Sequence, residues 1–197
     1  LSQHNRYDFG AAGQFSDVGT YDITVTGASD PNYNITPGPN AILTITEASP
    51  AITWNSPGQL AFNTPLNTTD HLTATAAVPG TFIYTPPHGI ILPLGDNQIL
   101  SVVFTPDDTL NYDAVNAMVM LDVVKADPVI SWPPPQDIVF GTLLDMTNHL
   151  NATADVPGSF VFMPPADARL DAGAAQVLTA TFTPADAATY NVATATQ

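Results

Sequence analysis

The chain contains no cysteine, so neither disulfide bonds nor thiolate metal sites can stabilise it. Its modules must therefore rely on side-chain packing. Basic residues are almost as rare, because only Arg6, Lys125 and Arg169 stand against 17 aspartates and Glu47, for a formal net charge of −15. A chain with so few cations cannot replace the counterions of nucleic acid. We therefore expect no nucleic-acid partner.

Long apolar runs are also missing. No stretch approaches the roughly 18 apolar residues that span a bilayer, so we expect no membrane insertion. The chain opens at Leu1 without the layout of a signal peptide, and we interpret it as a fragment of a longer protein. Helical periodicity is scarce as well, which argues against a helical fold.

Short runs of β-branched and aromatic residues fill most of the sequence instead. They recur about every eight to twelve residues and are cut by Pro, Gly, Asn and Asp. The chain has 19 prolines, which suit strand ends, turns and sheet edges. This pattern is typical of β-sandwich domains. The sequence therefore predicts an all-β fold of antiparallel β-sandwich modules.

An internal repeat dominates the sequence. Residues 48–119 recur as residues 126–197 at an offset of 78, without an insertion or a deletion, and about 30 of the 72 aligned positions are identical. The segment from Pro50 to Trp54, for example, returns from Pro128 to Trp132. Such a period marks an array of structural modules.

The repeat also explains the first part of the chain. The segment from Tyr21 to Val25 matches Leu100 to Phe104, and Tyr33 matches Tyr112. We therefore predict three modules. They are the C-terminal half of a β module at 1–47, a first full repeat at 48–125 (repeat 1), and a second at 126–197 (repeat 2) with a truncated last strand.

Strands are expected at fixed positions in each unit. Alternation of apolar and polar residues, as in Leu100, Val102 and Phe104, indicates strands with one buried face. Leu121 and Val123 are expected on the opposite face from Met118 and Met120. The expected strands are 21–27, 41–46, 52–54, 60–62, 72–77, 81–85, 99–105 and 114–124, with copies of the last six in repeat 2.

A Pro-Gly pair occurs once in each full repeat. Val78-Pro79-Gly80-Thr81 and its copy at 156–159 place Pro second and Gly third, as a type II turn requires. The third residue of such a turn has a positive φ. We expect each pair to join two strands in a hairpin.

Trp54 and Trp132 occupy equivalent positions and are expected to anchor the cores. The alternative is an exposed platform for stacking on sugars. Three tyrosines, Tyr33, Tyr112 and Tyr190, each follow a strand and a turn. This placement resembles a tyrosine corner, in which the ring packs inward and the hydroxyl bonds to upstream backbone.

The polar residues that recur offer little chemistry. His71 and His149 are expected to be partly buried packing residues. Asp107, Asp108, Asp113 and Asp186 could supply oxygen ligands to Ca²⁺, but only Asp108 and Asp186 are shared, so turn capping is the favoured interpretation.

Motifs of catalysis are not found in the sequence. It contains no phosphate-binding glycine loop, no HExxH and no nucleophile elbow. We expect no enzyme activity, and we assign no catalytic, cofactor-binding or metal-binding residue.

The repeated strings resemble a known family. Ile52-Thr-Trp54, Val78 to Pro86 and Phe104 to Tyr112 resemble the bacterial Ig-like repeats of very large secreted and surface proteins. The segments 18–25 and 41–45 look like the closing half of the related MBG-type module. The resemblance implies tandem Ig-like sandwiches in an elongated array, an extracellular location at the bacterial cell surface, and an adhesin-like or matrix-type stalk.

Three functions are suggested by this resemblance and the repeat. The first is a non-enzymatic spacer whose partners are neighbouring modules and a cell-surface or matrix component. The second is the subunit of an extracellular filament, assembled by β-strand complementation between chains. The third is a carbohydrate-binding module.

Overall fold

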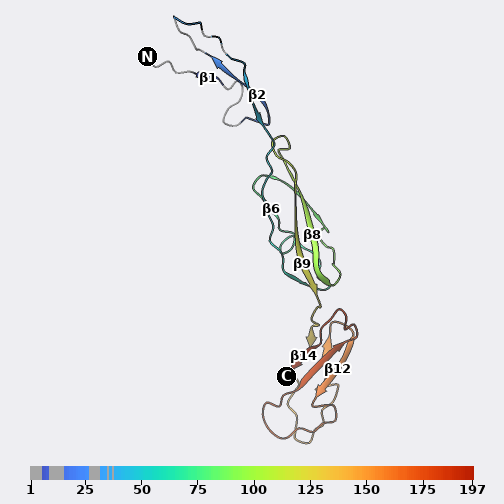
Figure 1. Cartoon of the computed structure of the whole chain (residues 1–197). Coiled ribbons are helices and arrows are strands. Elements are labelled where there is room, and N and C mark those ends of the chain that lie inside the picture. The colour runs from blue at the N-terminus through green and yellow to red at the C-terminus, as the bar shows by residue number, and fades with distance from the viewer. Residues whose placement is uncertain (1–5, 9–15, 27–31, 35, 37) are drawn as a thin grey trace. The chain divides into compact units, whose positions relative to one another are not determined.

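The computed structural model describes residues 6–8, 16–26, 32–34, 36 and 38–197, and their regular structure consists of strands (Figure 1). These residues include no helix, and hence none long and apolar enough to cross a membrane. Turns and irregular segments connect strands that belong to several separate sheets. The prediction of an all-β chain is thereby confirmed.

The first sheet belongs to the N-terminal part of the chain. It is antiparallel and has the order β1-β2-β3, with β1 at Arg6–Asp8, β2 at Gly19–Thr26 and β3 at Ala41–Ile45. β2 and β3 lie where strands were predicted, whereas β1 was not predicted. Gly27 and the turn at Asp30 and Pro31 lie outside the described residues.

Repeat 1 contains a two-stranded and a four-stranded sheet. β4 pairs with β6, and the larger sheet has the order β5-β9-β8-β7. β5 runs parallel to β9, and β7 runs antiparallel to β8. All six strands lie near their predicted positions, with β6 shorter and β8 longer than expected. They are β4 (Ile52–Thr53), β5 (Gln59–Ala61), β6 (Thr75–Ala76), β7 (Gly80–Thr85), β8 (Gly95–Pro106) and β9 (Val115–Val124).

The alternating patterns of β8 and β9 bury one face of each strand. Leu100, Val102 and Phe104 are all buried, as predicted. Leu121 and Val123 are 2% and 3% exposed, whereas Met118 and Met120 on the opposite face are exposed. Successive side chains of a strand point to opposite faces, so the sequence pattern alone decides which residues enter the core.

Repeat 2 forms only part of the same structure. β10 (Ile130–Ser131) pairs with β11 (Thr153–Ala154), and β12 (Gly158–Met163), β13 (Thr179–Pro184) and β14 (Ala193–Thr196) form an antiparallel sheet. The strand predicted at 138–140 is not formed. Its counterpart β5 forms a strand by pairing with Asp122–Val124, whereas residues 137–139 pair with none of the described residues.

The Pro-Gly pairs do not form the predicted turns. Positive φ occurs at Gly58 and Gly89, for example, but at neither Gly80 nor Gly158. The hairpin is also wrong, because β6 pairs with β4 while β7 pairs with β8. Glycine is required here because atoms of the neighbouring strand lie where a Cβ would stand. A Cβ on Gly80 would lie 2.4 Å from the Thr105 carbonyl oxygen.

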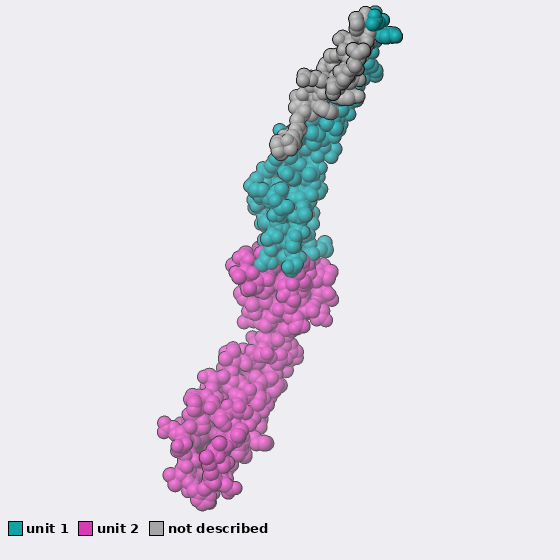
Figure 2. Space-filling view, turned by 90° about the vertical axis from the view of Figure 1, so that its left-hand side faces the viewer, with its two compact units in different colours: residues 1–55, 73–85, 101–118 teal, residues 56–72, 86–100, 119–197 magenta. Residues whose placement is uncertain are grey.

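The chain divides into two compact units that do not follow the repeat boundaries (Figure 2). The division passes through repeat 1, because β8 and β9 each contribute residues to both units. The domain boundaries after residues 47 and 125 stay predictions. One unit comprises 1–55, 73–85 and 101–118, and the other 56–72, 86–100 and 119–197.

Candidate functional site

The shared aspartates cap turns. Asp108 Oδ1 accepts the N–H groups of Leu110 and Asn111 at 3.3 and 3.2 Å, and Asp186 Oδ1 accepts those of Ala188 and Thr189 at 3.1 and 3.3 Å. The Asn111 side chain lowers the pKa of Asp108, and the Thr189 hydroxyl lowers that of Asp186. Turn capping at these two positions is confirmed.

The other candidate calcium ligands do not gather around them. Asp113 lies beside Glu47, where its hydrogen bond and then its charge raise the pKa of the Glu47 carboxyl. Among the described residues, no three His, Asp or Glu side chains are grouped so that they could hold a metal ion.

Both repeated histidines are buried, as core residues rather than as partly exposed ones. The N–H of Asn67 donates to His71 Nδ1 at 3.1 Å, and the N–H of Asp145 donates to His149 Nδ1 at 3.1 Å. Asp145 Oδ2 also lies 3.0 Å from His149 Nδ1. A hydrogen bond between these two atoms would require a proton on Nδ1. We favour the backbone bond, because it recurs at His71, where the partner residue carries no carboxylate.

The two tryptophans differ in burial although they are equivalent in sequence. Trp132 is 7% exposed, and its Nε1–H donates to the His149 carbonyl at 3.0 Å. This burial confirms a core anchor and excludes a sugar platform at Trp132. Trp54 is half-buried and packs edge-on against Tyr84 at 5.4 Å. The Tyr84 hydroxyl, replaced by hydrogen in Phe162, accepts the Ala74 N–H at 3.0 Å.

The tyrosines that follow β8 and β13 mark the junctions of the chain. Tyr33 is 76% exposed, so the expected inward packing is wrong there. Tyr112 and Tyr190 are half-buried and form parallel bridges with Ala48 and Ala126, the first residues of their repeats. Each tyrosine therefore lies where the entering segment meets its module.

The two junctions share one set of backbone hydrogen bonds. The Ala48 N–H donates to the Asn111 carbonyl at 2.9 Å, and the Asp113 N–H donates to the Ala48 carbonyl at 3.0 Å. At the second junction, Ala126 makes both equivalent bonds at 3.0 Å, with Thr189 and Asn191. Each entering segment is thus fixed to the module that it enters.

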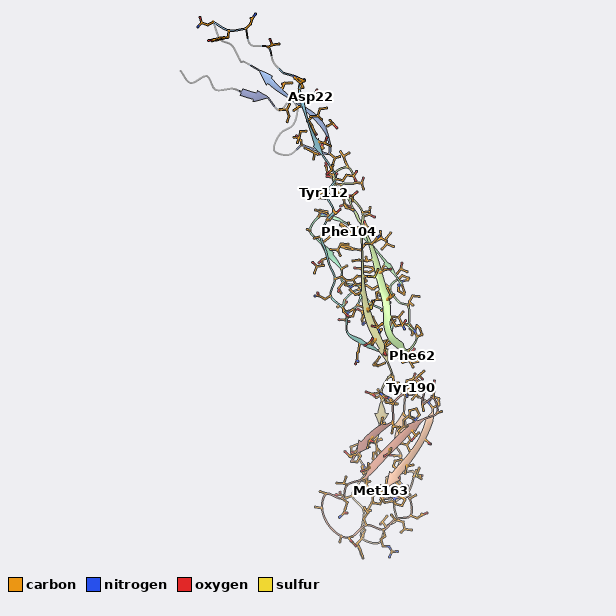
Figure 3. The ribbon with its side chains drawn as sticks, viewed as in Figure 1. Asp22, Phe62, Phe104, Tyr112, Met163 and Tyr190 are labelled. Carbon is orange, nitrogen blue, oxygen red and sulfur yellow. The ribbon has the colours of Figure 1, made fainter. Side chains whose placement is uncertain are left out.

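Side chains connect the second junction to the preceding repeat. The rings of Phe62 and Tyr190 meet edge-on, with centroids 6.1 Å apart (Figure 3). Lys125 Nζ donates to the Ala187 carbonyl at 2.5 Å. Phe62 lies just after β5 in repeat 1, so this ring contact connects repeat 1 to the tyrosine of repeat 2. The sequence does not reveal this contact, because the 78-residue offset alone does not show which module a ring faces.

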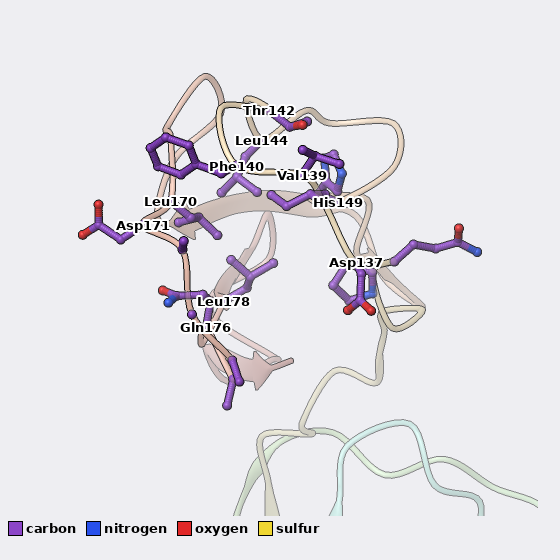
Figure 4. Close-up of a pocket in the computed structure, with 17 residues that line it drawn as sticks. Asp137, Val139, Phe140, Thr142, Leu144, His149, Leu170, Asp171, Gln176 and Leu178 are labelled. Atoms are coloured by element: carbon purple, nitrogen blue, oxygen red, sulfur yellow. The ribbon is translucent and has the colours of Figure 1, made fainter.

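A pocket of about 650 Å³ opens in repeat 2, between segments 135–142 and 170–178 (Figure 4). We call it the repeat 2 pocket. Leu144, Leu170 and Leu178 line it with apolar surface, and the Asp171 carboxylate points away from it. Polar side chains such as Asp137, Thr142 and Gln176 line it as well, so the pocket presents a mixed apolar and polar surface.

Comparison with known proteins adds no assignment to these sites. No family model matches the chain, and neither curated proteins nor solved structures give a match.

Proposed function

We propose that the chain is a non-enzymatic spacer segment of an extracellular, adhesin-like repeat protein at the bacterial surface. In this proposal, repeats 1 and 2 are tandem Ig-like β-sandwiches, and residues 1–47 are the closing half of an MBG-like module. The carrying observation is the repeated junction, in which Ala48 and Ala126 make the same backbone bonds to the modules they enter.

Two further observations support a spacer. The residues that recur at the 78-residue offset fill cores and shape turns, as Trp132, Phe182 and Asp186 do in repeat 2. Each linker is short, and its proline, Pro50 or Pro128, is buried against the protein. Short, proline-containing linkers limit bending between modules.

Small-angle X-ray scattering of the whole chain tests this function. A spacer predicts an extended particle whose maximum dimension falls little when salt is added. Phe62→Ala removes the ring contact at the second junction and should broaden the distribution of interatomic distances. Met163→Asp, an exposed substitution away from the junction, is the matched control. A compact particle for the unsubstituted chain would contradict the proposal.

A further inference from the structure

We propose that strands β7 and β12 are self-association edges, at which two copies of this chain pair strand to strand. The inference goes beyond a spacer role, because it makes neighbouring chains associate side by side. It rests on the sheet order, on the register of the hydrogen bonds and on the side chains of these two strands.

Both strands lie at the edge of a sheet. β7 is the last strand in the order β5-β9-β8-β7, and β12 is the first in the order β12-β13-β14. Within the part of the chain that the structure describes, no strand pairs with the free side of either one. Gly80–Thr85 and Gly158–Met163 are counterparts at the 78-residue offset, so the same open edge occurs in both repeats.

The register of β7 shows which backbone groups the free edge presents. The Asp107 N–H donates to the Pro79 carbonyl at 3.0 Å, which makes these two residues a hydrogen-bonded pair. Hydrogen-bonded and non-hydrogen-bonded pairs alternate along an antiparallel ladder, so Ile83 bonds to β8. The N–H and C=O groups of Phe82 and Tyr84 therefore point to the free edge.

Repeat 2 presents the same groups. The Ala185 N–H donates to the Pro157 carbonyl at 2.9 Å, and β12 continues this ladder along β13. The backbone groups of Phe160 and Phe162 therefore point to the free edge of β12. Each edge thus offers the donors and acceptors that an added antiparallel strand requires.

Neither edge carries the features that normally prevent pairing between chains, which are charged side chains, prolines and bulges. Segments 79–87 and 157–165 contain no charged residue, although the chain has 18 acidic residues. Ile83 and Val161, at the centres of the two strands, are 63% and 65% exposed. Prolines flank both strands without interrupting them, so pairing is limited to the strands themselves.

The side chains of β7 match a second copy of β7. In an antiparallel pair centred on Ile83, Ile83 lies opposite itself and Thr81 lies opposite Thr85. Phe82 then lies opposite Tyr84, so the free backbone groups of the two copies meet as hydrogen-bonded pairs. Each pair joins β-branched with β-branched or aromatic with aromatic side chains, which stabilises a sheet. The arrangement has two-fold symmetry, and both copies contribute the same surface.

β12 can pair in the same way around Val161, with Phe160 opposite Phe162. A chain with two such edges joins more than two copies, so chains should gather into side-by-side bundles.

Charge favours these edges over the rest of the surface for contact between copies. Each copy carries a formal net charge of −15, so most contacts would bring carboxylates together, whereas the two edges are uncharged. Salt screens the remaining repulsion between copies. Association should therefore strengthen as salt is added, which is the opposite of an assembly held by ion pairs.

Amide hydrogen exchange of the unsubstituted full chain, followed by NMR from micromolar to near-millimolar concentration at high salt, tests the proposal. The Phe82 and Tyr84 amides should exchange more slowly as the concentration rises, because they become bonded to the second copy. The Ile83 amide, which is bonded to β8 at every concentration, is the internal control. Exchange of Phe82 and Tyr84 at a rate independent of concentration would overturn the proposal.

Sedimentation velocity separates edge pairing from contact through the sheet face. In a chain that carries Val161→Asp to close β12, Ile83→Asp should weaken association at least about tenfold, because it places like charges opposite each other. Val103→Asp is the matched control, since Val103 pairs with Ile83 and is 43% exposed but lies on the central strand β8. An equal loss in both variants would contradict edge pairing. Unchanged unfolding curves by tryptophan fluorescence would show that the variants still fold.

Mixing tests the register. Ile83→Asp and Ile83→Lys chains, both carrying Val161→Asp, should each associate weakly alone, because position 83 lies opposite itself. A 1:1 mixture should recover association at least about tenfold, because the opposite charges then face each other. A mixture no stronger than its components would overturn the proposed pairing. The scattering test of the spacer is independent, because it uses dilute monomer.

Discussion

Gly158→Ala is expected to destabilise repeat 2 strongly. A Cβ at this position would lie 2.3 Å from Phe182 Cζ and 2.5 Å from the Thr183 carbonyl oxygen. Non-bonded carbon atoms prefer about 3.5–4.0 Å, so the overlap exceeds roughly 1 Å. Phe182 is 1% exposed and its ring cannot swing into solvent. Overpacking typically costs about 1–3 kcal/mol, and we expect about 3 kcal/mol because both obstacles are fixed.

The assay is unfolding followed by the fluorescence of Trp132, in a chain that carries Trp54→Phe so that only repeat 2 reports. A loss of about 3 kcal/mol in a module of this size corresponds to a fall in Tm of about 12–24 °C. Gly173→Ala is the matched control, since its Cβ would meet only the flexible Gln176 side chain at 3.3 Å.

Phe182→Leu should recover part of the loss when combined with Gly158→Ala. A double-mutant cycle should give a favourable coupling of about 1 kcal/mol or more. If Gly158→Ala unfolds within about 0.5 kcal/mol of the parent chain, close approach is not the reason for this glycine. If the cycle shows no coupling, the Phe182 ring is not the obstacle.

Three further predictions concern single residues. Tyr84→Phe should cost about 1–2 kcal/mol, because it leaves the buried Ala74 N–H without its acceptor. Burial raises the pKa of Tyr84, so the folded state holds the phenolic proton more tightly than the unfolded state does. The resulting stability is present below pH 10.0 and is lost as the pH rises. The free energy of unfolding of the Tyr84→Phe variant should therefore fall less steeply with pH in alkaline solution. Asp186→Ala should destabilise repeat 2 in neutral urea melts, and Asp186→Asn, which keeps an acceptor oxygen without the charge, should do so to a smaller extent. Because the pKa of Asp186 is lowered, its contribution is present above pH 3.8 and lost in acid, and both variants should flatten that loss. Ala175→Gly should stabilise repeat 2 by about 1 kcal/mol in the same melts, since Ala175 has a φ of 57°, whereas Ala174→Gly should give no gain.

The sequence pattern was sufficient for elements whose side chains alternate. β8 and β9 can be predicted from Leu100 to Phe104 and from Leu121 and Val123, because a buried face needs an apolar residue at every second position. The sequence pattern gave a wrong prediction where the role of a residue is set by contacts with residues distant in the sequence. Gly80 resembles a turn glycine in sequence, but the reason for it is the Thr105 carbonyl together with the Phe104 ring, which only the folded chain brings close.

The same limit applies to the candidate sites. The turn-capping aspartates were predictable, since Asp186 bonds residues two and three positions further along the chain. The ring contact of Phe62 with Tyr190 and the repeat 2 pocket were not, because both depend on how segments far apart in the sequence come together in the folded chain.

The contact between Phe62 and Tyr190 also bears on the order in which the chain unfolds. Stability in a repeat array is a sum of the stability of each module and a term for each interface with a neighbour. Repeat 1 has such an interface at its Phe62 end, whereas Phe140 of repeat 2 is exposed. Under heat or mechanical load, unfolding of this chain should therefore begin at repeat 2 and advance module by module, so that a repeat placed between two neighbours resists longest.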